Sequence, residues 1–456
     1  MKTLLRGAHI IDPGTRWDGP GDLLVIDGKI AGLGKRLKPQ ADFEVVELAG
    51  LVLTPGLIDM HVHLREPGRE DEETIESGCR AAAAGGFTSV ACMPNTDPVN
   101  DSETVTRFII DKARTAGLAN VFPVGAISKR SRGEQLAEIG EMVRAGARAI
   151  SDDGHPVMNS QLMRRAMEYA LMFDIPVIDH CEDKYLGAGG CMHEGRASVR
   201  LGLQGMHRSA EDVQVARDIL LSEATGARVH IAHLSSARSL ELVAAARSRS
   251  VPVTCEVTPH HLLLADEDVV NYDTNFKMNP PLRTRADRKA LLQGLADGTV
   301  DVIASDHAPH NINEKMLDFP SAPFGILGLE TMLALAITHL VRKKVVSWSR
   351  LVELLSRNPA QILNLKTKGA FRKGNDADVT LIDPRMSRTV LAAAFLSRSR
   401  NTPFDGWKVY GRCVGTMLGG KWVYKSQIAD RKSQIADGRH SVPRPAGSGG
   451  ANRTAS

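Results

Sequence analysis

The chain has 456 residues with 57 basic and 53 acidic side chains, a near balance that gives no general reason to expect nucleic acid or a membrane as a partner. Its six cysteines contain no CxxC pair and indicate no disulfide framework, and no apolar run approaches the roughly 18 residues of a membrane span. We therefore expect a cytoplasmic protein, and the length leaves room for a barrel domain of about 250 residues or more beside a smaller domain.

The two ends of the sequence predict short strands joined by tight turns. Residues 1–52 contain turn sequences such as Asp12-Pro13-Gly14, and a similar texture returns over 370–424. We expect these two segments to pair into one small β-sandwich-like domain. This domain would flank a barrel domain at 53–369.

A short apolar run at the start of the barrel domain contains two histidines that are one residue apart. His61 and His63 lie near the end of the run Leu57–Leu64. Alternate side chains of an extended strand share a face, so both imidazoles can bind one metal ion. Taken alone the pair is weak evidence, because strand histidines two residues apart are more often hydrogen-bonded surface or core residues.

Four later apolar runs also end in a residue that can bind a metal. The residues at their ends are Asp153, His180, His233 and Asp306. A strand that ends in His or Asp before a polar loop is typical of a (β/α)8 barrel, which builds its active site at the C-terminal ends of its parallel strands. Amphipathic helices are expected between the strands, as in the apolar spacing of 136–143. The predicted fold is an α/β TIM barrel with one shared pocket at the strand ends.

Each of these residues also has a purely structural interpretation. His180 beside Glu182 could be a solvated loop residue, and His233 could be a core histidine like its neighbour His230. Asp153 could be a turn residue or a helix cap. Six ligand-type residues from five strand ends, in this order, favour one metal site over six separate structural roles.

The end of the chain differs in composition from the rest. The hexapeptide at 425–430 recurs at 432–437, and Pro, Gly, Ser and Arg are frequent from there to Ser456. Such a composition cannot bury enough apolar surface to order itself. We expect a disordered extension over 425–456.

Five motifs occur together in one order and spacing: Asp59-Met60-His61-Val62-His63-Leu64-Arg65-Glu66-Pro67-Gly68, Gly86-Phe87-Thr88-Ser89-Val90 with Met93-Pro94-Asn95-Thr96, Ser151-Asp152-Asp153-Gly154, Asn279-Pro280-Pro281-Leu282-Arg283 and Ser305-Asp306-His307-Ala308-Pro309-His310. Together they resemble the dihydroorotases, in particular the long bacterial type I class of the cyclic amidohydrolase superfamily. The resemblance covers about residues 1–424. It implies a zinc-dependent enzyme that reversibly cyclises N-carbamoyl-L-aspartate to (S)-dihydroorotate plus water in de novo pyrimidine (UMP) biosynthesis.

The resemblance also implies a set of metal ligands. His61, His63 and Asp306 would bind the more buried zinc ion. His180 and His233 would bind a second zinc ion, and Asp153 would bridge the two. Many relatives use a carboxylated lysine as the bridge, so an aspartate at this position supports the type I class. We expect one or two zinc ions per chain, and two from the ligand set.

The same resemblance assigns roles around the substrate. Asp306 would act as the catalytic acid and base, and Arg65 would bind the carboxylate of dihydroorotate through its planar guanidinium. Further substrate contacts are expected from His63, Asn95, Asn279, His310 and the backbone of Phe324 and Gly325. Structural alternatives are that Arg65 pairs with Glu66 or Asp71 and that the two asparagines cap turns. The charged segment 309–320 is expected to be a loop that could close over the site.

Two other classes of protein share parts of this pattern. A hydantoinase or allantoinase would share the barrel and zinc, but it would lack Arg65 and normally carry the bridging lysine. A noncatalytic dihydroorotase-like scaffold for aspartate carbamoyltransferase would usually have lost metal ligands, and all six are present here. An active enzyme can still bind aspartate carbamoyltransferase, so that complex stays open. We expect a homo-oligomer that acts on a small molecule.

Overall fold

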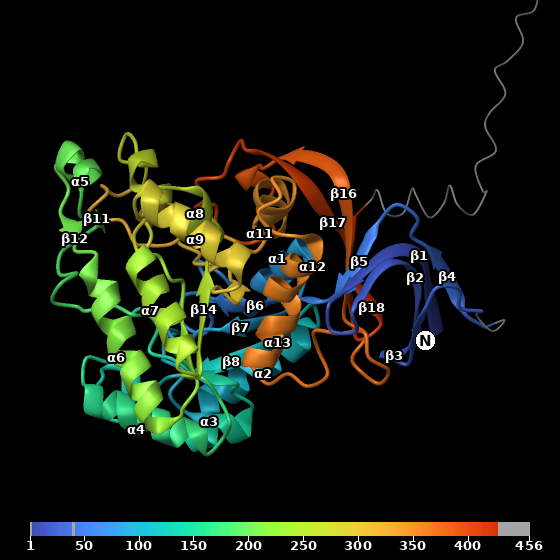
Figure 1. Cartoon of the computed structure of the whole chain (residues 1–456), viewed down its shortest axis with the longest axis horizontal. Coiled ribbons are helices and arrows are strands. Elements are labelled where there is room, and N and C mark those ends of the chain that lie inside the picture. The colour runs from blue at the N-terminus through green and yellow to red at the C-terminus, as the bar shows by residue number, and fades with distance from the viewer. Residues whose placement is uncertain (1, 39–41, 427–456) are drawn as a thin grey trace, which may run out of the picture.

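The computed structural model describes residues 2–38 and 42–426, and the larger part of it is a barrel of parallel strands (Figure 1). Neighbouring strands pair in the order β15-β14-β13-β10-β9-β8-β7-β6. Their bounds are β6 Leu57–Val62, β7 Phe87–Cys92, β8 Asn120–Gly125, β9 Ala149–Ile150, β10 Val177–Asp179, β13 Val229–Ile231, β14 Val253–Val257 and β15 Val302–Ile303.

Contacts between the first and last strands close the barrel. Val62 at the end of β6 forms a parallel bridge with His307, and the His63 N–H donates to the His307 carbonyl at 2.9 Å. The buried Asp59 Oδ1 on β6 accepts a hydrogen bond from the Ser305 N–H at 3.0 Å. The α/β TIM barrel predicted from the strand ends is therefore confirmed.

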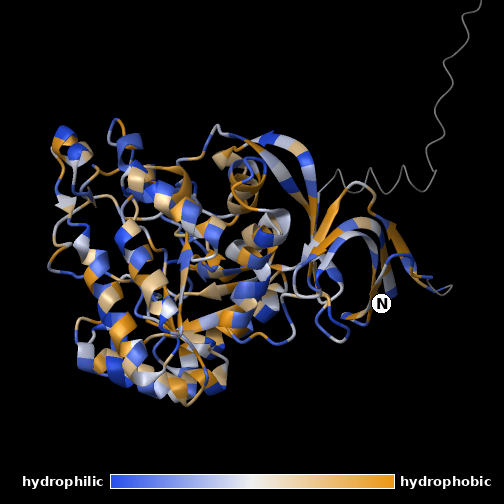
Figure 2. Ribbon diagram, viewed as in Figure 1, coloured by the Kyte–Doolittle hydropathy of each residue, from blue (hydrophilic) through white to orange (hydrophobic). Residues whose placement is uncertain are grey.

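Helices cover the outside of the barrel, and the longer ones mix apolar and polar residues along their length (Figure 2). In α4 (Ser160–Leu171), the Asn159 side chain accepts hydrogen bonds from the first free N–H groups of the helix. This helix buries residues three or four apart, which lie on one face: Met163, Ala166, Met167 and Ala170. Among the described residues, no helix combines the length and apolar character needed to span a membrane.

The other helices have the following bounds: α1 Ile75–Gly85, α2 Glu103–Ala116, α3 Ile139–Ala145, α5 Arg196–Leu201, α6 Ser209–Thr225, α7 Ala237–Ser248, α8 Pro259–Leu263, α9 Arg285–Asp297, α10 Ile312–Lys315, α11 Met332–Ala336, α12 Trp348–Val352 and α13 Asn358–Ile362. Single turns of 3-10 helix are η1 Lys129–Ser131, η2 Asp266–Asp268, η3 Thr274–Phe276 and η6 Ala392–Ala394. Two π-helical turns, η4 Ile337–Val341 and η5 Glu353–Arg357, continue α11 and α12.

The two terminal segments pair into a separate sheet in the order β18-β17-β16-β5-β1-β2-β3, with β4 beside β1 (Figure 1, right). Its strands are β1 Lys2–Asp12, β2 Trp17–Ile26, β3 Lys29–Gly34, β4 Glu44–Glu47, β5 Val52–Pro55, β16 Val379–Thr389, β17 Lys408–Leu418 and β18 Lys421–Lys425. The antiparallel pairing of β5 with β16, in which Leu53 faces Leu381, joins the two ends of the chain. Buried Leu5 and Val379 belong to the same apolar core. A minor pair, β11 Met192–His193 and β12 Gly205–Met206, lies apart from both sheets.

The sheet reaches slightly further along the chain than the sequence predicted. β18 ends at Lys425, and the Ser426 N–H donates to the Val414 carbonyl at 3.0 Å. These two residues, which we assigned to the disordered extension, therefore pair with the sheet. The rest of the predicted extension, 427–456, lies outside the described residues.

Candidate metal and substrate site

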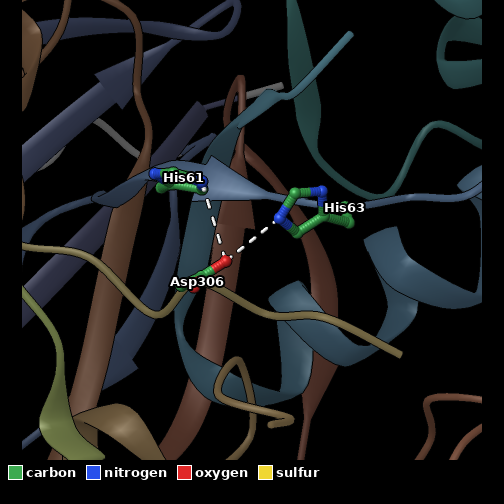
Figure 3. Close-up of side chains that lie close together, drawn as sticks. All are labelled: His61, His63 and Asp306. Atoms are coloured by element: carbon green, nitrogen blue, oxygen red, sulfur yellow. Dashed lines mark hydrogen bonds and ion pairs between the residues drawn. The ribbon is translucent and has the colours of Figure 1, made fainter. Parts of the chain in front are cut away.

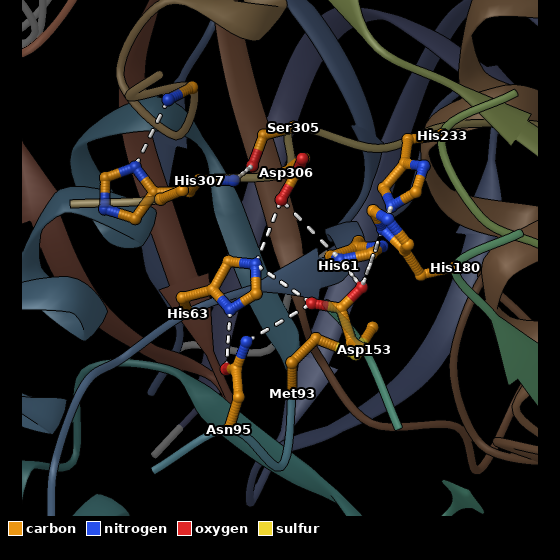
Figure 4. A network of polar contacts seen from close by, with 12 residues as sticks. His61, His63, Met93, Asn95, Asp153, His180, His233, Ser305, Asp306 and His307 are labelled. Atoms are coloured by element: carbon orange, nitrogen blue, oxygen red, sulfur yellow. Dashed lines mark hydrogen bonds and ion pairs between the residues drawn. The ribbon is translucent and has the colours of Figure 1, made fainter. Parts of the chain in front are cut away.

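All six predicted metal ligands converge at the C-terminal ends of the barrel strands (Figure 4). His61 lies on β6, and His63 follows directly after that strand. The other four follow β9, β10, β13 and β15: Asp153, His180, His233 and Asp306. None of the six is more than 5% exposed. Because parallel strands end at the same rim of the barrel, residues that are far apart in sequence meet here.

His61, His63 and Asp306 form the first group of donor atoms (Figure 3). Asp306 Oδ1 lies 3.0 Å from His63 Nε2 and 3.6 Å from His61 Nε2. Ligand atoms held at about 2.0–2.1 Å around a tetrahedral ion are themselves about 3.3 Å apart. The three side chains therefore have the spacing of ligands to a single ion.

The carboxylate of Asp153 lies between this group and a second one (Figure 4). Asp153 Oδ1 is 3.4 Å from His61 Nε2, 3.7 Å from His233 Nε2 and 3.8 Å from His180 Nδ1. Its other oxygen is 3.6 Å from His63 Nε2. Asp153 is thus placed where a bridging ligand would lie.

The electrostatics of this cluster fit a cation. Within the described part of the chain, no lysine or arginine forms an ion pair with Asp153 or Asp306, and three buried atoms have no hydrogen-bond partner: His61 Nε2, Asp153 Oδ1 and His233 Nδ1. Burial opposes ionisation of Asp153, but the neighbouring His61 and His233 outweigh it and hold the pKa of Asp153 well below its usual value. Imidazoles that bind a metal are neutral, so these buried carboxylates then require another positive charge, which the metal ion itself would supply.

Three residues of the site have backbones in the left-handed region. Arg65, His233 and Asp306 have φ values of 59°, 32° and 46°. Such conformations cost residues other than glycine about 1–3 kcal/mol each, and they persist only where the surrounding structure holds them. Here the chain turns sharply at the strand ends and directs these side chains inward.

A cavity of about 320 Å³ opens beside the cluster. Among its lining residues are all the predicted site residues except His61: His63, Arg65, Asn95, Asp153, His180, His233, Asn279, Asp306, His310, Phe324 and Gly325. His61 is completely buried. The structure therefore brings every predicted ligand and substrate residue to one place.

Arg65 reaches the cavity by a route that the sequence did not predict. β6 ends at Val62, so Arg65 lies three residues beyond the strand and enters the cavity through its positive φ. Its Nε pairs with Glu72 at 3.1 Å, not with Glu66 or Asp71, because the turn after β6 points the side chain toward Glu72. The same Nε donates to the Pro309 carbonyl at 3.1 Å, which fixes the guanidinium at the cavity wall.

The two asparagines contact the histidines and carboxylates of the site. His63 Nδ1 and Asn95 Oδ1 are 2.8 Å apart, and Asn95 Nδ2 donates to Asp153 at 3.3 Å. Asn279 Nδ2 donates to Glu182 at 2.8 Å and lies 3.4 Å from His180 Nε2. Both amides therefore orient ligand-type side chains at the cavity wall.

The backbone of Phe324 and Gly325 is already largely bonded within the protein. The Gly325 N–H donates to the Lys277 carbonyl at 2.9 Å, and the Gly325 carbonyl accepts from Lys315 Nζ at 3.2 Å. The Phe324 carbonyl lies 2.7 Å from His310 Nε2. Within the described residues, the Phe324 N–H is the group of this pair left for a ligand.

Comparisons with known proteins agree with this geometry. A family model described as dihydro-orotase-like matches residues 50–239. The chain is 51% identical over 429 residues to a dihydroorotase of Solibacter usitatus, which covers 93% of this chain and 99% of the relative. A dihydroorotase of Pelotomaculum thermopropionicum is 52% identical and covers 94% of this chain and all of the relative.

The chain belongs to the dihydroorotase family. Like its relatives, it is a cyclic amide hydrolase. Solved structures with the same fold include the L-hydantoinase (dihydropyrimidinase) of Arthrobacter aurescens, which has a TM-score of 0.83 and 25% identity and covers 93% of this chain and 96% of that one. A dihydropyrimidinase of Brevibacillus agri has a TM-score of 0.80 at 23% identity, over 93% of this chain and 95% of that one. The strand-end motifs thus predicted both the fold and the family.

The site also contains buried acids that we did not predict. Glu256 on β14 contacts His61, and Glu72 contacts both Arg65 and His310. A single glutamate inside the apolar strand Val253–Val257 is a sequence signal that could have pointed to Glu256. Glu72 lies in an acidic run that is typical of a solvated surface, so no comparable signal pointed to it.

Proposed function

We propose that this chain is a zinc-dependent dihydroorotase that reversibly cyclises N-carbamoyl-L-aspartate to (S)-dihydroorotate plus water, a step of de novo pyrimidine biosynthesis toward UMP. The observation that carries the proposal is the position of Arg65 in the same cavity as His63, Asp153 and Asp306. A guanidinium beside metal-ligand side chains suits a cyclic amide that carries a carboxylate. A neutral hydantoin ring would leave that charge unused.

The ligand set supports two zinc ions. His61, His63 and Asp306 would hold one ion and His180 and His233 the other, with Asp153 as the shared ligand. Mixed imidazole and carboxylate donors suit zinc better than magnesium or calcium. When bound, zinc supplies a water of about neutral pKa and polarises the amide carbonyl.

Asp306 would carry the proton of the reaction. Burial opposes its ionisation, but His61 and His63 outweigh burial and lower the pKa of Asp306, so the carboxylate is ionised and has free lone pairs. In the hydrolytic direction it would take a proton from the attacking water and deliver it to the departing ring nitrogen.

The cavity wall would hold the substrate by its carboxylate and ring. Arg65 would bind the carboxylate, and Asn95, Asn279 and His310 would complete that contact. Arg65 Nη2 lies 3.3 Å from His310 Nε2, so the two side chains can share one anionic group. The Phe324 N–H would bond the ring, because the Gly325 N–H is already bonded.

The proposal is tested by measuring turnover of dihydroorotate, hydantoin and allantoin by the purified protein, with the metal content determined on the same sample. We expect turnover of dihydroorotate alone, with one to two zinc ions per chain. Faster turnover of hydantoin would overturn the substrate assignment, and full activity without bound zinc would overturn the metal assignment.

We further propose that the chain forms a homo-oligomer in the cytoplasm and that aspartate carbamoyltransferase is a candidate partner. Light scattering of the purified protein measures the oligomeric state directly. Mixing it with the transferase and repeating the mass measurement tests the complex. A mass equal to one chain, unchanged by the transferase, would contradict both assembly proposals.

A further inference from the structure

Glu256 is a buried carboxylate that contacts proposed metal ligands without being one of them. It lies on β14 and is completely buried. Within the described residues no lysine or arginine pairs with it, and its ion-pair partners are two histidines, His61 and His230. A charge in such a place is costly unless hydrogen bonds and a nearby cation compensate it.

Both oxygens of Glu256 accept hydrogen bonds from the strands around it. His61 Nδ1 lies 2.7 Å from Glu256 Oε1, and His230 Nε2 lies 3.2 Å from Oε2. The His233 N–H donates to the same Oε1 at 3.3 Å. His230 Nδ1 in turn lies 2.8 Å from Thr254 Oγ1, so β13 and β14 are linked through the carboxylate.

The contact with His61 selects one form of that imidazole. Glu256 Oε1 lies 2.7 Å from His61 Nδ1, and a carboxylate oxygen only accepts hydrogen bonds. The proton of neutral His61 must then sit on Nδ1. The lone pair of Nε2 is left to face Asp153 and Asp306, which are 3.4 and 3.6 Å away.

The contact with His233 acts on the backbone. His233 has a φ of 32°, a conformation that residues other than glycine rarely adopt. The bond from its N–H to Glu256 Oε1 holds this turn at the end of β13. One carboxylate oxygen therefore contacts a member of each proposed ligand group, His61 of the first and His233 of the second.

We propose that Glu256 is a positioning residue for both metals: it fixes the ligating tautomer of His61 and the backbone turn that places His233. The inference rests on the proposed metal site. Partners of this kind, one bond away from a metal ligand, typically contribute 10- to 100-fold to metal affinity.

The test measures the affinity of the metal-free protein for Zn²⁺ by competition with a chelator, together with the melting temperature of the same metal-free samples. We expect Glu256→Ala to weaken zinc binding by about 10- to 100-fold. Glu256→Gln should lose less, because the amide oxygen can still accept from His61 while the amide NH₂ donates to His230. The matched control is Thr254→Val, which removes the outer bond of the network without touching a ligand and should change the zinc dissociation constant less than twofold.

The possible results separate the inference from the proposed function. A wild-type protein that binds no zinc tightly would refute the metal site itself. A folded Glu256→Ala protein that binds zinc within about twofold of the wild type would refute the positioning role alone. If Glu256→Ala fails to fold, Glu256→Asp decides, because the shorter side chain keeps the charge but cannot reach His61, His230 and the His233 N–H together. Unchanged zinc affinity of this variant, with only a lower melting temperature, would show that the residue is merely structural.

Discussion

Arg65 and Asp306 line the same cavity, but they would act on different parts of the substrate. The carboxylate of dihydroorotate keeps its charge throughout the reaction, so a residue that binds it stabilises the ground state and the transition state alike. A proton moves only at the reacting amide, so the residue that carries it acts on the transition state. Substitution of each residue should therefore change a different kinetic constant.

Arg65→Met should raise KM strongly and leave kcat nearly unchanged. Loss of a charge-assisted contact with the substrate carboxylate is expected to cost about 2–4 kcal/mol in kcat/KM. Glu72 keeps Arg69 as a partner at 2.9 Å, which limits the damage to the fold. Arg65→Lys is the control, since it retains the charge and loses the planar fork. Steady-state kinetics that show an unchanged KM for Arg65→Met would point to a substrate without that carboxylate.

Asp306→Asn should lower kcat by about 10² or more while substrate still binds, because the amide cannot accept the proton. Asp306 is also a proposed metal ligand, so zinc content must be measured on each sample before its kinetics are compared. A variant that retains both zinc and a near-normal kcat would remove Asp306 from the acid and base role.

At the level of elements, two buried lysines hold the loop that carries Phe324 and Gly325. Lys277 Nζ donates to the Pro320 carbonyl at 2.8 Å, and Lys315 Nζ at the end of α10 donates to the Pro323 carbonyl at 3.0 Å. Both side chains are at least 92% buried. Lys315 belongs to the segment 309–320 that we expected to close over the site, so that segment is fastened to the loop that carries Phe324 and Gly325.

Lys315→Met should loosen this loop and raise KM by about tenfold, because small displacements of substrate-positioning groups are costly. The free energy of unfolding should change little. Burial together with the nearby Lys277 lowers the pKa of Lys315 to about 7, so the charged form of this lysine is unfavourable in the folded protein. Lys343→Met, at an exposed lysine, is the matched control. The prediction fails if both variants have the same KM.

At the level of the whole molecule, Glu330 connects the barrel with the C-terminal segment. Its carboxylate accepts hydrogen bonds from the Leu396 N–H at 2.6 Å and the Ser397 N–H at 3.3 Å. Burial nevertheless raises the pKa of Glu330 to about 7. Between about pH 4.5 and 7, Glu330 therefore keeps its proton in the folded protein and has lost it in the unfolded chain.

This link predicts a pH dependence of stability. Because the pKa of Glu330 is higher in the folded than in the unfolded protein, its contribution to the free energy of unfolding is fully present below about pH 4.5. That contribution is lost as pH rises to about 7. We expect the loss to be about 1–3 kcal/mol, with partial solvent screening taken into account. Glu330→Gln cannot titrate, so the difference in unfolding free energy between wild type and variant should change over this range. Denaturant unfolding at several pH values measures it, and a constant difference would contradict the assignment.

Ending the chain after Ser426 should leave melting temperature and specific activity nearly unchanged. The removed residues contain few large apolar side chains, whereas Lys425 and Ser426 pair with the sheet and are retained. Ending the chain after Tyr424 removes those pairs and should cost more stability. A large loss from the first truncation would show that residues 427–456 dock on the described part of the molecule.

The sequence by itself determined the barrel, the sheet built from both ends and the set of residues around the cavity. His61 and His63 could be read from one strand, and Asp153 and Asp306 from the ends of others, because a strand end is a local pattern and parallel strands share one rim. The motifs also identified the family, because their order and spacing can be recognised in the sequence without a three-dimensional structure.

Only the tertiary structure decided which partners hold these residues in place. Glu256 is 195 residues from His61 along the chain, and the bond between them exists only because the barrel closes. The partner of Arg65 was likewise set by a positive φ after β6, which brings Glu72 within reach. Hydrogen bonds and ion pairs depend on distances of a few tenths of an ångström between distant segments, and local sequence patterns carry no such information.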